Sequence, residues 1–142
     1  MLLFVFLYRM EYIEISGENG HIEKIFAHTF DLHWIHSVEK EEWYETYTVK
    51  DGRLFLTKTY FKTYGAGVPT DSKYETKLNK NGFVEVTINE FREALFLNVS
   101  SNVKTEIHYD EKTIKLFEIY EDYTPVDIKV VKKPLIFYLL SI

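Results

Sequence analysis

Three turn dipeptides divide this sequence into short runs that are rich in β-branched and aromatic residues. They are Asn19-Gly20, Asp51-Gly52 and Asn81-Gly82, and such pairs favour two-residue hairpin turns because both positions tolerate positive φ angles. Short β-type runs separated by turn signals are typical of sandwiches and barrels. We therefore predict an all-β chain that folds as an antiparallel β-sandwich or a partly open β-barrel of about 10–12 short strands.

Size and composition favour a single domain of this class. The chain has 142 residues, and its 11 Tyr and 11 Phe contribute to an aromatic content of 17%, which favours pleated sheet. It contains no cysteine, so disulfides, thiolate metal sites and thiol nucleophiles are excluded. The formal charge of -5 argues against a nucleic-acid partner, which requires clustered Lys and Arg.

Alternation and turn signals together locate the expected strands. Two short segments have a helical pattern instead, Ile88 to Ala94 and Leu116 to Tyr120, and neither is long enough to change the fold class. The expected strands cover residues 11–16, 21–28, 29–37, 42–50, 53–61, 73–78, 83–88, 94–100, 103–109, 112–117, 126–132 and 135–140.

Residues 1–9 are expected to form an apolar N-terminal stub that precedes a single all-β domain over residues 10–142. Met1 to Tyr8 are apolar and are followed by Arg9, and this run is much shorter than the roughly 20 apolar residues that span a bilayer. It also lacks the basic start and the small-residue cleavage site of a signal peptide. Two interpretations stay open: a first strand, or the remnant of an export anchor.

The alternation of side chains in the segment 29–61 predicts a polar row across three strands. A two-residue turn at Asp51-Gly52 places Glu45 opposite Lys58. A tight turn before the middle strand places His36 opposite Glu45, and a looser turn would shift this second pairing. The expected row is therefore His36–Glu45–Lys58, and Ser37 points to the opposite face.

Two interpretations of this row stay open. Desolvating a lone carboxylate on an apolar face is costly, so Glu45 is expected either to form a structural ion pair with Lys58, capped by His36, or to set the tautomer of a functional His36. A metal site that also uses Glu39 is conceivable, but it matches no specific ligand pattern. A serine hydrolase built on Ser37 lacks the Gly-x-Ser-x-Gly elbow.

Two loops at the same end of the sheet complete the candidate site. One spans Ser37 to Glu41, and the other spans Tyr64 to Thr70, where glycine permits positive φ or the close approach of a bound group. We predict no catalytic residue and no cofactor. The residues expected to bind a ligand or a partner are His36, Ser37, Glu39, Glu45, Gly65, Gly67 and Pro69.

These motifs resemble a bacterial family called domain of unknown function 1850. The resemblance covers about residues 10–131, with its strongest part in 30–69, and Val68 stands where leucine is usual. The residues that carry it are Phe30, Trp34-Ile35-His36-Ser37-Val38-Glu39, Glu45, Asp51-Gly52, Phe61 and Tyr64-Gly65-Ala66-Gly67-Val68-Pro69.

The resemblance implies a small extracytoplasmic, membrane-associated domain, although residues 1–9 are only a stub where an N-terminal anchor is expected. Such proteins are commonly encoded beside tripartite ATP-independent periplasmic (TRAP) transporters of the TAXI subclass. The first expectation is a non-enzymatic accessory or binding module, with the permease, the solute-binding protein or a small solute as partner. The alternative is a small hydrolase or a metal-dependent enzyme that uses His36 and Glu45.

Overall fold

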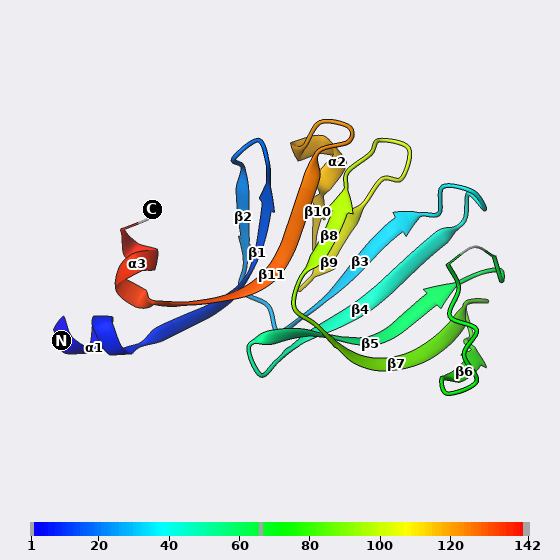
Figure 1. Cartoon of the computed structure of the whole chain (residues 1–142), viewed down its shortest axis with the longest axis horizontal. Helices are drawn as coiled ribbons and strands as arrows, with labels where there is room; N and C mark the ends of the chain where they lie inside the picture. The colour runs from blue at the N-terminus through cyan, green and yellow to red at the C-terminus, as the bar shows by residue number, and fades with distance from the viewer. Residues whose placement is uncertain (1, 66, 141–142) are drawn as a thin grey trace.

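The computed structural model describes residues 2–65 and 67–140 as two antiparallel sheets packed face to face. Met1 of the predicted stub, Ala66 of the glycine loop and residues 141–142 lie outside the described residues. Figure 1 shows the sheets side by side with their strands twisted, as in a sandwich, and no closed barrel forms in the described part of the chain. The prediction of an all-β sandwich is confirmed.

The smaller sheet has the strand order β2-β1-β11-β8. It comprises β1 (Arg9–Gly17), β2 (Ile22–Ile25), β8 (Leu95–Asn98) and β11 (Pro125–Pro134). The larger sheet has the order β10-β9-β3-β4-β5-β7-β6. It comprises β3 (Thr29–Ile35), β4 (Glu42–Lys50), β5 (Arg53–Phe61), β6 (Glu75–Leu78), β7 (Val84–Arg92), β9 (Glu106–Tyr109) and β10 (Lys112–Lys115).

Two short helices lie near the ends of the described chain. The helix α1 (Leu2–Leu7) lies in the N-terminal stub, for which a first strand was one of the two open interpretations, and α3 (Leu135–Leu139) replaces the strand predicted over 135–140. The two helices lie together at one end of the molecule (Figure 1). Strand pairing ends where Arg9 meets Pro134, because proline has no N–H to continue the ladder.

Two further expectations concerned internal helices. The short helix α2 (Leu116–Ile119) confirms the pattern at Leu116 to Tyr120, but the segment Ile88 to Ala94 instead completes β7 and leads toward β8. In the described part of the chain, no helix has the length and apolar character needed to cross a membrane.

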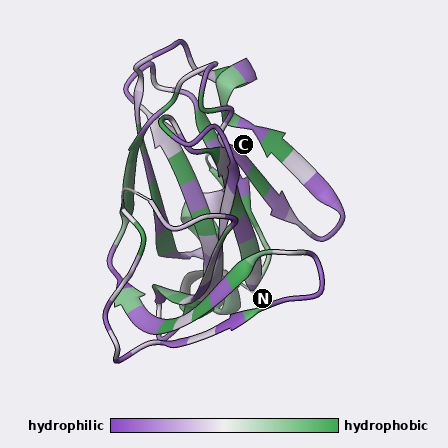
Figure 2. Cartoon of the chain, turned by 90° about the vertical axis from the view of Figure 1, so that its right-hand side faces the viewer, coloured by the Kyte–Doolittle hydropathy of each residue, from purple (hydrophilic) through white to green (hydrophobic). Residues whose placement is uncertain are grey.

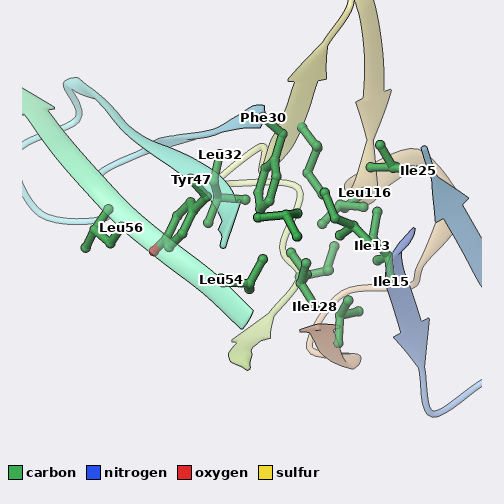
Figure 3. Close-up of a cluster of buried hydrophobic side chains, with 14 of the residues drawn as sticks. Ile13, Ile15, Ile25, Phe30, Leu32, Tyr47, Leu54, Leu56, Leu116 and Ile128 are labelled. Carbon is green, nitrogen blue, oxygen red and sulfur yellow. The ribbon is translucent and has the colours of Figure 1, made fainter. Parts of the chain in front are cut away.

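The main hydrophobic core fills the space between the two sheets. Strand residues alternate between apolar and polar side chains, which Figure 2 shows as bands along the ribbons. Figure 3 shows the inward side chains from both sheets meeting, and Phe30 stacks on Tyr47 with ring centroids 5.3 Å apart. A smaller cluster of Trp43, Phe61 and Val86 lies on the inner face of the larger sheet.

The hairpin between β4 and β5 follows the predicted register only over its first half. The turn at Asp51-Gly52 pairs Tyr47 with Leu56 as expected, but the register shifts beyond that point, so that Glu45 faces Thr59. The extra residue is Thr57, whose hydroxyl donates to the backbone oxygen of Thr46 at 3.0 Å. Such a β-bulge reverses which face the following side chains occupy.

The connection between β3 and β4 is longer than the predicted tight turn. Glu45 faces Leu32. The predicted pairing of Glu45 with His36 is therefore wrong, and the true partner lies four positions earlier in the chain. The backbone N–H of His36 donates to the oxygen of Glu41 at 2.8 Å and closes the turn. Because the shift is even, Leu32 and Glu45 keep the inner face that the alternation predicted.

Candidate functional site

The two predicted loops do lie against each other. Gly65 sits beneath the side chain of Glu39, so a Cβ atom at position 65 would overlap the Glu39 carboxylate. Gly67 has a φ angle of 81°, a left-handed conformation that favours glycine. The glycines are therefore explained by close approach at one position and by backbone conformation at the other.

His36 holds the turn that leads into β4. Its Nδ1 accepts hydrogen bonds from the backbone N–H groups of Glu39 at 3.2 Å and Val38 at 3.4 Å. In the neutral ring, the proton is therefore on Nε2. The ring also stacks on Trp43, with centroids 5.5 Å apart. The ring and its Nδ1 therefore stabilise the corner of the fold where the His36 turn packs against the glycine loop.

The corner has little room for a ligand. The free volume among His36, Glu39, Trp43, Gly65 and neighbouring side chains is about 10 Å³, which is close to the smallest cavity that holds one water molecule. Ser37 and Gly67 are exposed, and Pro69 is partly buried. The structure therefore brings His36, Glu39 and the glycine loop together, and it leaves Glu45 outside this group.

Lys58 is on the opposite face of the sheet from Glu45. Its ammonium donates to Oε1 of Glu85 at 2.6 Å, and Lys77 approaches the same oxygen at 3.4 Å. The hydrogen bond from Lys58 is the main cause that lowers the pKa of Glu85. The predicted Glu45–Lys58 ion pair is therefore wrong, because the bulge at Thr57 turns Lys58 outward.

Glu45 points to the inner face and is half-buried. The hydroxyl of Tyr47 donates a short hydrogen bond to its Oε2, and no other hydrogen bond to the Glu45 side chain is found among the described residues. Burial raises the pKa of Glu45, whereas the Tyr47 hydrogen bond and the charge of Arg92 partly oppose this rise. Burial and the neighbouring carboxylate likewise raise the pKa of Tyr47.

An open cleft of about 400 Å³ adjoins this carboxyl group. It lies between the inner face of β3 and β4 and the edge strand β8, which pairs only with β11. Among the described residues that line the cleft, Glu45 alone has a carboxylate. The lining residues are Leu32, Trp34, Glu45, Tyr47, Ala94, Leu95, Phe96, Leu97, Asn98, Val103 and Thr105.

Sequence reasoning found one side of this cleft and missed the other. Glu45 was recognisable as a carboxylate on an apolar face. The opposite wall comes from β8 and the loop after it, with Leu97 and Thr105 among its residues. The sequence contains no signal that this distant segment lies opposite β4, because the contact depends on the chain crossing between the sheets.

The predicted metal interpretation gains no geometric support. No group of three or more His, Cys, Asp or Glu side chains in the described residues is arranged to hold a metal ion. His36 and Glu45, the two residues proposed for an enzyme, line different cavities. The site is best described as an apolar cleft with a single, half-buried carboxyl group at its wall.

A comparison with protein families matches one model to residues 30–116, described as a domain of unknown function, DUF1850. The matched range begins in β3 and includes the His36 turn, the glycine loop and all of the residues that line the cleft. No curated protein and no solved structure matches the chain at a significant level.

The raised pKa of Glu45 gives a prediction for stability. The folded state favours the protonated acid, so this stabilisation is fully present below the ordinary value of 4.5 and is lost as pH rises through the raised pKa. Glu45→Gln keeps an acceptor for Tyr47 and does not titrate. We expect the free energy of unfolding of the wild type to fall relative to that of E45Q as pH rises from 4.5 through the raised pKa. Urea unfolding at several pH values measures the difference, and a constant difference would contradict the prediction.

Proposed function

We propose that this chain, which belongs to the DUF1850 family, is a non-enzymatic module that binds a small, mainly apolar solute in the Glu45 cleft. The observation that carries the proposal is the coincidence of an apolar cleft and a half-buried carboxyl group at its wall. Ligand sites typically combine apolar walls with a few polar groups that fix orientation. The volume of about 400 Å³ is within the range of such sites, about 300–1,000 Å³.

The polar groups of the cleft suit recognition better than catalysis. Glu45 and Tyr47 lie on β4, while Thr105 is a neutral polar residue of the opposite wall. Tyr47 is the other titratable residue among the described residues that line the cleft, and its raised pKa makes its phenol a poor acid or base near neutral pH. The alternative of a hydrolase or metal-dependent enzyme has no comparable observation in its favour, because His36 is part of the packed turn.

The proposal includes a role beside a solute transporter. The resemblance in residues 30–69 suggests an extracytoplasmic, membrane-associated accessory of a TRAP transporter of the TAXI type, in contact with its permease or its solute-binding protein. The corner formed by the His36 turn and the glycine loop is a suitable contact surface. Val38 is 68% exposed there and Tyr64 is 63% exposed. The turn that carries Val38 is held by the hydrogen bond to His36 and by the stacking of His36 on Trp43. Exposed apolar groups of this kind are enriched where proteins meet.

The binding proposal is tested with indole as a neutral apolar probe. We expect millimolar indole to shift the amide resonances of Leu95, Leu97 and Thr105 in a nitrogen–proton correlation spectrum. Ala94→Phe should fill the cleft and remove these shifts, and Leu97→Trp, at a position that lines the cleft and packs against the core, provides a second block if the first variant unfolds. Ser37→Ala, outside the cleft, should leave them unchanged. Shifts that are absent, or that survive both blocking variants, would contradict the proposal.

The transporter role is tested by co-purification with the permease subunits of a TAXI-type TRAP transporter from the same organism. We expect the wild-type chain to be retained, and a Val38→Ser, Tyr64→Ser double variant to lose about tenfold or more in affinity. Leu78→Ser is the matched control, because Leu78 is 74% exposed and lies on the edge strand β6. An absence of wild-type retention, or an equal loss in the control, would argue against this contact.

A further inference from the structure

The Glu45 cleft has a charge pattern that selects among ligands. Its walls are apolar, its one carboxylate is at the wall, and the aromatic side chains on its inner-face wall are Trp34 and Tyr47. Trp34 comes from β3, and Tyr47 comes from β4, the strand that also carries Glu45. An organic cation is stabilised both by a carboxylate and by the π faces of aromatic rings. The formal charge of the chain is -5, which favours the approach of cations.

We infer that the cleft selects small apolar molecules with a protonated amine, and that Glu45 is the counter-ion for that amine. This inference rests on the proposed function, because it names the ligand class of the same cleft. The apolar body of the ligand would contact the leucine side chains of β8. Its ammonium group would donate to Glu45, and Tyr47 and Thr105 are further polar residues among those that line the cleft.

The charged groups around Glu45 are compatible with this role. Arg92 on β7 is the cation whose charge acts on Glu45 and Tyr47. Its guanidinium is held elsewhere, since Nη2 lies 3.0 Å from Oε2 of Glu90 and Nη1 donates to the backbone oxygen of Phe91 at 3.1 Å. Arg92 therefore has its own carboxylate partner, and Glu45 is left with one hydrogen bond, from an uncharged phenol.

An amine ligand would also offset the free energy lost when the Glu45 carboxylate is desolvated. Without a cation, the largely desolvated carboxylate is disfavoured, and the pKa of Glu45 is raised. A bound ammonium would stabilise the ionised form and lower that pKa. Binding of an amine should therefore release a proton from Glu45 and strengthen as pH rises, while a neutral ligand should show no such dependence.

Three probes that share a phenyl ring distinguish the binding of a cation, a neutral molecule and an anion. They are 2-phenylethylamine, 2-phenylethanol and phenylacetate. We expect the full chain to bind the amine about tenfold or more tightly than the alcohol, and the anion more weakly than either. Affinity for the amine should fall from about pH 8 to about pH 5, where the amine itself stays protonated. Calorimetric or NMR titration measures all three affinities.

Glu45→Gln should lower affinity for the amine to that for the alcohol and leave alcohol binding unchanged. Glu42→Gln is the matched control, since Glu42 is an exposed acid on the same strand, paired with Lys62, and the amine preference should survive it. Equal binding of amine and alcohol, tighter binding of the anion, or a preference that survives E45Q would overturn the inference while the binding module stands. Failure of all three probes together with indole would overturn the proposed function.

Discussion

The β-bulge at Thr57 is the constraint on which the candidate site depends. One extra residue in β5 places Lys58 on the outer face, where it binds Glu85, and leaves Glu45 on the inner face without a cationic hydrogen-bond partner. A regular hairpin would have set Lys58 beside Glu45. The carboxylates of Glu45 and Glu85 would then both have had different partners, so a single backbone irregularity determines that Lys58 pairs with Glu85 and not with Glu45.

A second irregularity in the next strand accompanies the first. The register between β5 and β7 shifts between Leu56 and Lys58, and Asn89 has a φ angle of 56°. Asn is among the few residues that adopt this left-handed conformation readily. Three residues later, after Arg92, the chain leaves the larger sheet and forms β8 in the smaller one. The cleft exists because β8 is an edge strand that stands apart from the inner face of β4.

The family motif and the cleft have different physical roles. The His36 turn packs on Trp43, and the indole N–H of Trp43 donates to Thr59 at 2.7 Å. Thr59 in turn faces Glu45 across the β4–β5 pair. The motif therefore fixes the end of β4 that carries Glu45, and it presents an exposed corner to the surroundings. In the proposed function, one part binds the solute and the other contacts the transporter.

Local chemistry explains which features could be predicted. Asp51-Gly52 specifies its own turn, so the register near it was predictable, and Leu116 begins a short helix as its pattern indicated. The bulge at Thr57 has no signature in residue type, since threonine is common in regular strands. The wall formed by β8 depends on a contact between segments about fifty residues apart in the chain. The helices α1 and α3 could not be predicted, because they depend on the pairing of β1 with β11 stopping at Arg9 and Pro134.

The most direct test of this account is the pKa of the Glu45 side chain, measured by carbon NMR of the carboxyl group in the wild type and in Lys58→Met. If the bulge separates the two residues, the Glu45 pKa should lie above its ordinary value of 4.5, and the loss of Lys58 should leave it unchanged. A pKa below that value in the wild type, or a clear rise on substitution of Lys58, would show that Glu45 and Lys58 are paired and would contradict the account.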